Sequence, residues 1–320
     1  MTAAAGQPAW VEPELATLTG DRFSDPAWLY ERKFDGERCL AYRSGDQVRL
    51  MTRNQKVVND TYPELAARLL AQECADFIID GEVVAFAGEQ TSFSLLQQRL
   101  GVRHPSDALR ADVPVFYYVF DVLWADGRDL RQLPLDGRKQ ALRPLLSFEG
   151  PIRFTTHRRR DGEAYLAEAC AKGWEGLVVK RGDSPYRSGR SRDWLKFKCQ
   201  ANQEFVIAGY TDPKGSRTGF GALLIGYYDS DGGLVYAGKV GTGFDDATLT
   251  ALAQTLRGLE RSRPAFDRGN LPRTGVHWVE PRLVGQVAFS EWTRAGQLRH
   301  PRFEGLRRDK DPTTVVRETA

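Results

Sequence analysis

The stretch ERKFDGER, residues 31–38, decides how the first half of the chain is interpreted. Apolar and aromatic runs at residues 29–33 and 39–43 are typical of β-strands, and the Asp-Gly pair at 35–36 is a turn signal between them. The pattern predicts a strand that delivers Lys33 to a tight turn. A lysine amine is a nucleophile only when neutral, so we expect an adjacent arginine and bound metal ions to lower its pKa. On its own, the stretch equally fits a hairpin turn with a surface lysine.

Outward from this stretch, residues 28–198 mix short strands with short helices. Residues 61–64 have the pattern of a capping box, and leucines at helical spacing follow them. Asp161 is expected to cap a helix that ends near Gly173. Further strands are expected at residues 47–52, 77–80, 115–123 and 174–180.

The texture of the sequence changes after Lys198. Gly and Asp turns separate most of a series of β-rich runs, and one helix is expected at residues 245–259, capped by Asp245 or Asp246. Five strands with one intervening helix suit a small Greek-key barrel such as the OB-fold, with a β-sandwich as the alternative. The length of 320 residues favours two domains, 1–200 and 201–320. The five strands are expected at residues 204–210, 222–228, 234–239, 276–280 and 286–290.

Bulk composition excludes little. The formal net charge is +3, which does not indicate a nucleic-acid partner, and the arginine-rich clusters at 158–160, 187–192 and 299–310 fit solvated surface better than a binding face. No GxxxxGK[ST] loop is present, and Gly241-Thr242-Gly243 lacks the third glycine of a dinucleotide fingerprint. The four cysteines form no CxxC pair, so we expect no disulfide framework and a reducing cytoplasm. Without a signal peptide or an apolar run of bilayer length, the protein is expected to be cytoplasmic, with residues 1–10 as a loose arm.

Seven segments carry a resemblance that no single one of them would support. In order along the chain, they resemble motif I, the next ligase motif, and motifs III, IIIa, IV, V and VI of the covalent nucleotidyltransferases, the superfamily of DNA ligases, RNA ligases and mRNA capping enzymes. The chain is most similar to bacterial ATP-dependent DNA ligases, both the ligase module of end-joining enzymes and minimal stand-alone ligases. Residues 22–28 and 298–305 also have the look of that group. The segments are ERKFDGER at 31–38, TRN at 52–54, DGE at 80–82, FYYVFDVL at 116–123, EGLVVK at 175–180, WLKFK at 194–198 and RRDK at 307–310.

The resemblance implies a fold and a reaction. The fold is α+β: an adenylation domain of antiparallel sheets with flanking helices, followed by an OB-fold β-barrel. The reaction seals 3′-OH/5′-phosphate nicks in duplex DNA, using ATP, through lysyl-AMP and DNA-adenylate intermediates. Lys33 would attack the α-phosphate of ATP, Asp35 would orient the lysine and the acceptor end, and Arg38 would contact phosphate or the acceptor strand.

The resemblance also implies a nucleotide pocket. Glu31 would approach adenine through its backbone and Phe120 would stack on it, whereas an aromatic in such an apolar strand is otherwise a core residue. Glu82 and Glu175 would hold Mg²⁺ or Mn²⁺, a hard cation that prefers carboxylate oxygen. Lys180 belongs to the cofactor-binding set. The alternating Lys196 and Lys198 share one face of a strand and suit a phosphate, although an amphipathic edge strand has the same pattern.

Further residues are implied to act on DNA and pyrophosphate. Arg53 would bind the broken strand near its end. Arg307 and Lys310 would swing onto pyrophosphate during lysine adenylation and then leave, which requires a hinge after Lys198. Residues 212–220, rich in Gly, Lys and Arg, are a candidate DNA-contacting loop.

Two competing interpretations stay open at this point. An RNA ligase or a capping-type nucleotidyltransferase shares most of the motifs, although the RxDK ending and the TRN segment favour a DNA ligase. An OB-fold DNA-binding module without catalysis would be expected to lack Lys33 and its surrounding charges. For a ligase, the expected partners are nicked double-stranded DNA and repair proteins such as an end-binding protein or a repair polymerase. The protein is expected to be a bacterial monomer with no membrane partner.

Overall fold

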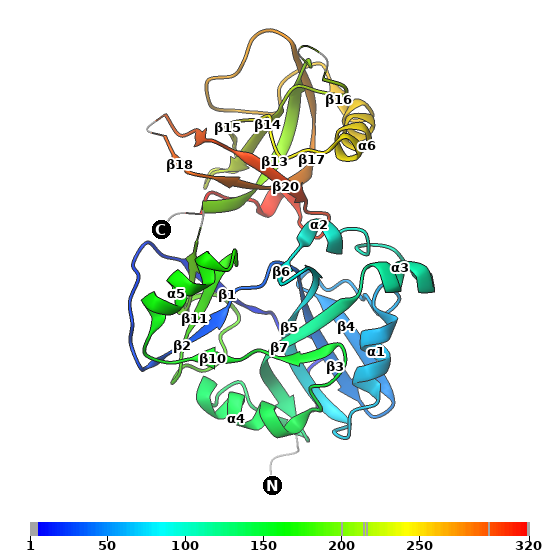
Figure 1. Cartoon of the computed structure of the whole chain (residues 1–320), viewed down its shortest axis with the longest axis vertical. Coiled ribbons are helices and arrows are strands. Elements are labelled where there is room, and N and C mark those ends of the chain that lie inside the picture. The colour runs from blue at the N-terminus through cyan, green and yellow to red at the C-terminus, as the bar shows by residue number, and fades with distance from the viewer. Residues whose placement is uncertain (1–5, 200, 214, 216, 294, 319–320) are drawn as a thin grey trace. The chain divides into compact units, whose positions relative to one another are not determined.

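The computed structural model describes residues 6–318 except 200, 214, 216 and 294. The chain divides into two compact units, here called the N-terminal unit (residues 1–199) and the C-terminal unit (residues 200–319). Figure 1 labels the helices and strands of both units. Each unit is described by itself.

The N-terminal unit contains two sheets. One has the strand order β1–β12–β11–β2–β10, and the other has the order β4–β3–β5–β7–β8, with β6 paired to β5 and β9 paired to β7. Pairing is antiparallel except for β1 with β12 and β7 with β9. The strands of the first sheet are β1 (Glu14–Leu18), β2 (Trp28–Arg32), β10 (His157–Arg158), β11 (Gly176–Arg181) and β12 (Gly189–Lys198). Those of the second are β3 (Glu37–Ser44), β4 (Gln47–Thr52), β5 (Asp76–Ala87), β6 (Gln90–Thr91), β7 (Val115–Ala125), β8 (Arg128–Asp129) and β9 (Ile152–Phe154).

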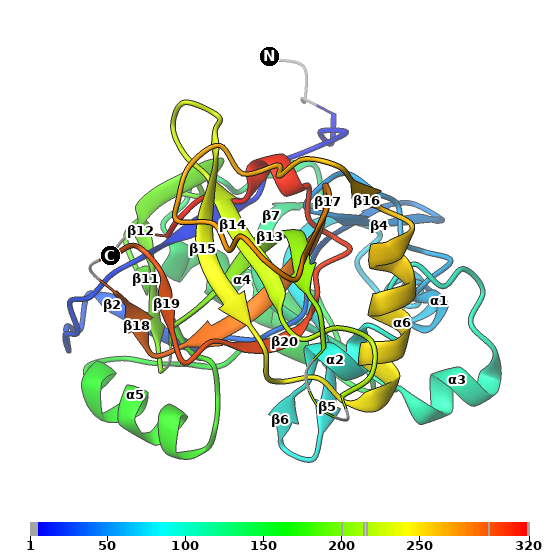
Figure 2. The ribbon, with the colours of Figure 1, turned by 90° about the horizontal axis from the view of Figure 1, so that it is seen from above.

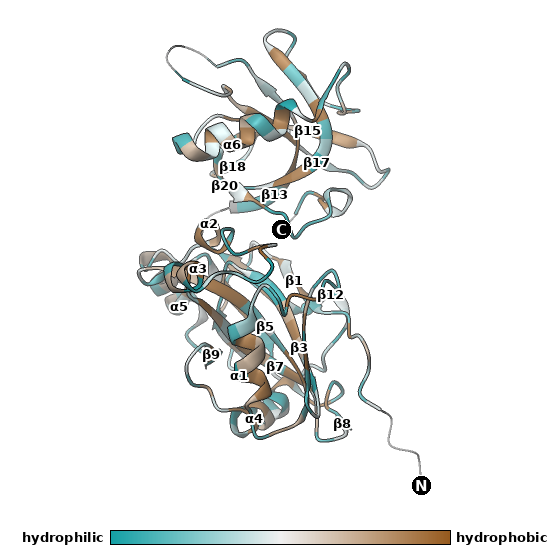
Figure 3. Cartoon of the chain, turned by 90° about the vertical axis from the view of Figure 1, so that its right-hand side faces the viewer, coloured by the Kyte–Doolittle hydropathy of each residue, from teal (hydrophilic) through white to brown (hydrophobic). Residues whose placement is uncertain are grey.

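Helices cover the outer faces of these sheets. α1 packs Leu65 and Leu69 into the main core with β3, β5 and β7, while α5 packs Tyr165 and Ala169 against the first sheet. A third apolar cluster, which includes Phe120 and residues of β3, β5 and β12, lies between the sheets. Figure 3 shows the hydrophobic colour running along β3, β5 and β7. The helices are α1 (Pro63–Leu70), α2 (Phe93–Leu96), α3 (Asp107–Asp112), α4 (Leu135–Leu145) and α5 (Gly162–Ala171).

The predicted helix caps meet different outcomes. The prediction of a capping box at residues 61–64 is wrong, because the N-cap residue of α1 is Tyr62 and its side chain makes no capping hydrogen bond. Pro63 starts α1 instead, in the position where its missing N–H is not needed. Asp161 precedes α5 as predicted but also makes no side-chain cap. The expected cap at Asp245 is confirmed, since its carboxylate accepts from the Thr248 N–H.

The C-terminal unit is built on one antiparallel sheet with the order β15–β14–β13–β17–β16, and β20 pairs with β17. α6 buries Leu249, Leu252 and Leu256 on one side of this curled sheet, and Figure 2 shows the helix beside it. A second apolar cluster fills the other side. The elements are β13 (Ala201–Thr211), β14 (Leu223–Tyr228), β15 (Leu234–Val240), α6 (Asp246–Arg257), β16 (Glu260–Arg261), β17 (Val276–Phe289), β18 (Glu291–Trp292), β19 (Leu298–Arg299), β20 (Arg302–Leu306) and the 3₁₀ helix η1 (Pro312–Thr314).

The two strands predicted at 276–280 and 286–290 are one strand, β17. Its pairing with β13 shifts register where Ile207 faces Leu283 and Gly209 faces Trp278. Pro281 lies in this irregular stretch, outside the positions at which β17 pairs with β13 and β16, so its missing N–H is tolerated there. The proline suggested a break between two strands in the sequence. In the structure it lies at a bulge within one strand.

Candidate active site

Lys33 lies directly after β2, beside the first residues of β11. Its backbone N–H donates to the Gly176 carbonyl at 2.9 Å, and its Nζ donates to the Glu175 carboxylate. The two side chains are only 18% and 11% exposed. Because β2 pairs with β11 through residues 28–32, the register of the sheet brings Lys33 to Glu175.

The charges around Lys33 differ from the expectation. Burial lowers the pKa of Lys33, but the attraction of Glu175, Asp35 and Glu82 outweighs burial, and the pKa is raised above its ordinary value. The expected lowering of this pKa by an adjacent arginine does not occur, because the neighbours that dominate are carboxylates, whereas the expected lowering by bound metal ions stays a prediction. The structure therefore holds Lys33 as an ammonium, paired with Glu175.

Glu175 in turn has two further cations near it. Burial raises the pKa of Glu175, and Lys33, Lys198 and Lys196 together lower it by a larger amount. Lys196 and Lys198 alternate along β12, opposite Val178 and Gly176 of β11. The structure thus brings the two predicted strand lysines to the same carboxylate as Lys33.

Arg38 is held by a buried carboxylate. Its Nε and NH2 donate to the two oxygens of Asp80 at 2.6 Å each, and the Tyr186 hydroxyl donates to the same carboxylate at 2.6 Å. Such a bidentate fork fixes the orientation of the guanidinium. Although burial alone would lower it, the pKa of Arg38 is raised by Asp80. Glu82, two residues further along β5, faces Arg38 across the β3–β5 ladder.

Phe120 belongs to the apolar cluster between the two sheets. Its ring is 4.5 Å from the Arg38 guanidinium carbon and 4.0 Å from the Lys180 Nζ, and it meets Trp194 edge-on at 6.0 Å. The ring is 7% exposed. Its predicted contact with adenine stays a prediction, and the structure adds that two cations already border the ring.

Glu31 places its side chain, as well as its backbone, in this region. Its carboxylate pairs with Lys139 and, at 2.6 Å, with Lys180, and all three side chains are buried. Burial raises the pKa of Glu31, but the two ammonium groups outweigh it and lower the pKa. Burial, which the attraction of Glu31 offsets only in part, and repulsion from Lys139 together lower the pKa of Lys180 to about 8. Glu31, Lys139 and Lys180 therefore form a buried group of three charges, and its Lys180 contacts the ring of Phe120.

Sequence reasoning missed two buried cations, Lys139 and Arg138. Lys139 belongs to the buried triad, and Arg138 makes a fork with Asp121 at 2.8 and 2.9 Å with both side chains fully buried. Both come from α4, where Leu135, Arg138, Lys139 and Leu142 are its buried residues. The available signal was this helical spacing, because two cations share the apolar stripe of an otherwise ordinary amphipathic helix.

The remaining predicted residues lie elsewhere in the chain. Arg53 follows β4 in a turn and is exposed. Arg307 makes a fork with Asp309 at 3.0 and 2.9 Å, and Lys310 pairs with Glu204 at 3.1 Å, all within the C-terminal unit. The structure thus gathers the predicted residues of the N-terminal unit other than Arg53 around Lys33 and Phe120, and it places Arg307 and Lys310 in the other unit.

Two carboxylates near Lys33 suit a divalent cation. Within the residues that the structure describes, no group of three His, Cys, Asp or Glu side chains could hold a metal. Mg²⁺ needs fewer, because it typically uses one or two protein carboxylates together with substrate phosphates and water. Glu175 and Glu82, which both act on the pKa of Lys33, fit that requirement.

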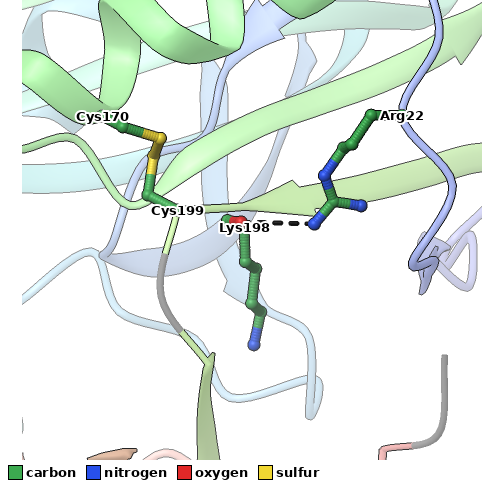
Figure 4. The surroundings of a disulfide bond; sticks show 4 residues. All are labelled: Arg22, Cys170, Lys198 and Cys199. Atoms are coloured by element: carbon green, nitrogen blue, oxygen red, sulfur yellow. Dashed lines mark hydrogen bonds between the residues drawn. A yellow bond between two sulfur atoms is a disulfide. The ribbon is translucent and has the colours of Figure 1, made fainter. Parts of the chain in front are cut away.

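A disulfide joins Cys170 to Cys199, with a Cα–Cα distance of 5.3 Å. Figure 4 shows it beside Lys198, whose carbonyl accepts from Arg22 at 3.3 Å. The Cys199 N–H also donates to the Glu175 carbonyl at 3.0 Å. The expectation of no disulfide is wrong here, because the fold brings the end of α5 to the end of β12 across 29 residues that sequence spacing alone does not relate.

The structure describes the loop at residues 212–220 in part. Residues 214 and 216 lie outside the described residues. Arg217 donates to the Gly241 carbonyl at 2.7 Å, and Asp212 meets the His277 Nε2 at 2.8 Å. Its predicted contact with DNA stays a prediction. Among the helices of the described residues, none has the length and apolar character needed to cross a membrane.

Comparison with known proteins gives consistent results. The family model described as ATP dependent DNA ligase domain matches residues 15–198, and that described as ATP dependent DNA ligase C terminal region matches residues 216–310. The multifunctional non-homologous end joining protein LigD of Pseudomonas aeruginosa is 39% identical over 318 residues, which cover 97% of this chain and 37% of that protein. A probable DNA ligase of Streptomyces avermitilis is 34% identical over 300 residues, which cover 89% of this chain and 57% of that protein.

Solved structures agree with these relatives. A mycobacterial DNA ligase D complexed with ATP and MES is 33% identical, with a TM-score of 0.68 over 96% of this chain and 98% of that chain. The predicted fold class, a nucleotidyltransferase domain followed by an OB-fold domain, is confirmed. The chain spans less than two thirds of the length of the two curated relatives described above.

Proposed function

The chain belongs to the ATP-dependent DNA ligases, and from this premise we propose that it seals nicks in duplex DNA by way of a lysyl-AMP on Lys33. The observation that carries the proposal is the shielded Lys33–Glu175 pair, with Lys196 and Lys198 beside it. A buried amine next to cations that suit phosphate is what nucleotidyl transfer to a lysine requires.

Three phosphoryl transfers make up the reaction. The neutral Lys33 amine attacks the α-phosphorus of ATP, the bond to pyrophosphate breaks, and the amine loses a proton. A 5′-phosphate oxygen at the nick then attacks the same phosphorus, and the Lys33 nitrogen leaves and regains a proton. Finally the 3′-hydroxyl attacks the adenylated 5′-phosphate, loses its proton, and releases AMP. The protein contributes mainly positioning and neutralisation of charge.

The resting charges define what the first step must overcome. Lys33 is held as an ammonium by Glu175, so it must lose its proton against that attraction. Glu175 and Glu82 would hold Mg²⁺ or Mn²⁺, and the bound ion would supply neutralisation of phosphate charge. Lys196 and Lys198, whose charges act on Glu175, would take the phosphate oxygens.

Other parts of the proposal follow the resemblance. Glu31, Phe120 and Lys180 would border the adenosine, with Asp35 and Arg38 toward the acceptor end and Arg53 on the broken strand. Arg307 and Lys310 would serve pyrophosphate release from the C-terminal unit. We infer a role in DNA repair, since a similar protein is named for non-homologous end joining. The partners would be an end-binding protein or a repair polymerase, and the enzyme would act as a cytoplasmic monomer.

The test follows AMP onto the protein. The full chain is incubated with ATP and Mg²⁺, and its intact mass and peptide map are recorded. We expect one AMP on Lys33, no AMP in Lys33→Met, and an unchanged yield in the control Lys172→Met. Lys172 is an exposed lysine that pairs with Glu168. AMP attachment that persists in Lys33→Met would show that the nucleophile is another residue.

Substrate assays separate the alternatives. Nicked DNA, nicked RNA and RNA with a 5′-diphosphate end are compared, with ATP and GTP as nucleotide donors. Sealing of nicked DNA with ATP supports the proposal. Preference for RNA or for GTP would favour an RNA ligase or a capping-type enzyme, and DNA binding without any AMP transfer would favour a non-catalytic module.

A further inference from the structure

Arg32, the residue directly before Lys33, is enclosed by aromatic side chains. Its guanidinium carbon lies 4.4 Å from the ring centroid of Trp174, 5.2 Å from that of Phe34 and 5.5 Å from that of Phe86. NH2 donates to the Glu89 carbonyl at 3.1 Å, while Nε is buried and has no hydrogen-bond partner among the described residues. Aromatic contacts, rather than hydrogen bonds, therefore provide much of the hold on this cation.

The rings around Arg32 come from segments distant in the sequence. The ring centroid of Tyr118, on β7, lies 4.2 Å from that of Phe34 and 6.0 Å from that of Phe86, which is near the end of β5. We call Arg32, Phe34, Phe86, Tyr118 and Trp174 the Arg32 cluster. It connects the end of β2, in one sheet, with β5 and β7 in the other, and with the loop before β11.

The cluster holds the chain on each side of the reacting pair. Arg32 and Phe34 flank Lys33 in sequence, and Trp174 directly precedes Glu175. The backbone bond from the Lys33 N–H to the Gly176 carbonyl joins the same two segments at 2.9 Å. The main chain of Lys33 is thus held through both neighbours, and that of Glu175 through one.

We propose that Arg32 is a positioning residue for adenylation, an inference that rests on the proposed function. The contact of Arg32 with Trp174 sets the distance between the Lys33 amine and Glu175. It also keeps the Lys33 amine directed at the phosphate when the ion pair opens. The reaction needs this because Lys33 must leave Glu175, bind AMP and return, all without its backbone moving. A displacement of about 1 Å at a reacting centre can cost about 100-fold in rate.

The test measures single-turnover adenylation of the full chain at saturating ATP. Arg32→Met keeps the length of the side chain and removes its charge and planarity, whereas Arg32→Lys keeps the charge. Arg49→Met is the matched control, since that guanidinium also lies over a ring, 5.2 Å from Tyr42, but on β4. Rates are normalised to the protein that finally carries AMP, and thermal unfolding is recorded for each variant.

We expect Arg32→Met to slow adenylation about 10- to 100-fold with ATP affinity nearly unchanged, and Arg32→Lys to recover part of the rate. A purely structural role would reduce the active fraction without slowing the normalised rate, and Arg32→Lys would then recover no rate.

An Arg32→Met rate equal to that of Arg49→Met would overturn the proposal. If Arg32→Met does not fold, Arg32→Lys and Trp174→Phe decide instead: both should adenylate more slowly than the unmodified chain, and unchanged rates in both would refute the role. The unmodified chain separates the two hypotheses. No AMP on its Lys33 would refute the proposed function, whereas normal adenylation with unaffected Arg32 variants would refute only the positioning role.

Discussion

Opposite charges meet in both units, but in different surroundings. In the N-terminal unit the Arg138–Asp121 fork is fully buried, and in the C-terminal unit the side chains of the Arg299–Glu291 pair are 60% and 58% exposed. The Arg307–Asp309 fork of the C-terminal unit departs from that pattern, because its side chains are only 10% and 11% exposed. Its two residues lie in the segment that resembles motif VI. In each of these two shielded forks at least one partner lies in a motif segment, Asp121 in the first and both residues in the second, and burying charge is costly unless the pair has excellent geometry.

The largest effect should follow from breaking the most deeply buried pair. Arg138→Met leaves the Asp121 carboxylate buried without its partner, so we expect the N-terminal unit to lose about 3–5 kcal/mol of unfolding free energy. Hydrogen exchange of peptides from that unit, read by mass spectrometry, measures the loss. The double variant Arg138→Met/Asp121→Leu should recover part of it, and no recovery would show that lost packing, rather than stranded charge, is responsible.

A somewhat smaller effect is expected at the disulfide. Closing a loop between Cys170 and Cys199 should stabilise the N-terminal unit by about 2–4 kcal/mol through restriction of the unfolded chain. Oxidised protein should therefore melt at a higher temperature than protein kept in a phosphine reductant, and Cys170→Ser should make melting insensitive to the reductant. Four free thiols in denatured, oxidised protein would contradict the pairing.

The pH dependence of adenylation tests the charges around Lys33. Because Glu175 raises the pKa of Lys33, the reactive amine is scarce at neutral pH, and the single-turnover rate should rise about tenfold per pH unit below that pKa. In Glu175→Gln the largest attraction on the ammonium is lost, so the pKa of Lys33 should fall relative to the unmodified chain and the profile should move to lower pH. Glu291→Gln, in the exposed pair, is the control, and an identical shift there would refute the assignment.

The smallest effect belongs to the exposed pair itself. Arg299→Ala should change unfolding free energy by no more than about 1 kcal/mol, because solvent and salt screen such charges. Urea unfolding at low and high salt provides the measurement. A loss comparable to that of Arg138→Met would remove the contrast between the two units. Reduced affinity for nicked DNA with normal stability would instead indicate that Arg299 serves binding.

The sequence predicted the site less evenly than the fold. The order of motifs identified the family and its two-domain fold, and local patterns found β2, β3 and the Asp245 cap. The Asp80 partner of Arg38 lay inside a recognised motif, but its fork with Arg38 depends on the register of β3 against β5. Arg138 and Lys139 were missed because a cation on a helix is ordinarily on the solvent side, and only packing shows that α4 turns them inward.

By itself, the sequence determined which residue types occur in which order: a lysine before a turn, two carboxylates, alternating lysines and an RxDK ending. Only the tertiary structure decided which of them meet. Lys33 and Glu175 are 142 residues apart, and their pairing follows from the antiparallel register of β2 and β11. The sign of the Lys33 pKa shift was decided in the same way. Burial and nearby carboxylates act in opposite directions, and their balance depends on distances that the order of residues does not contain.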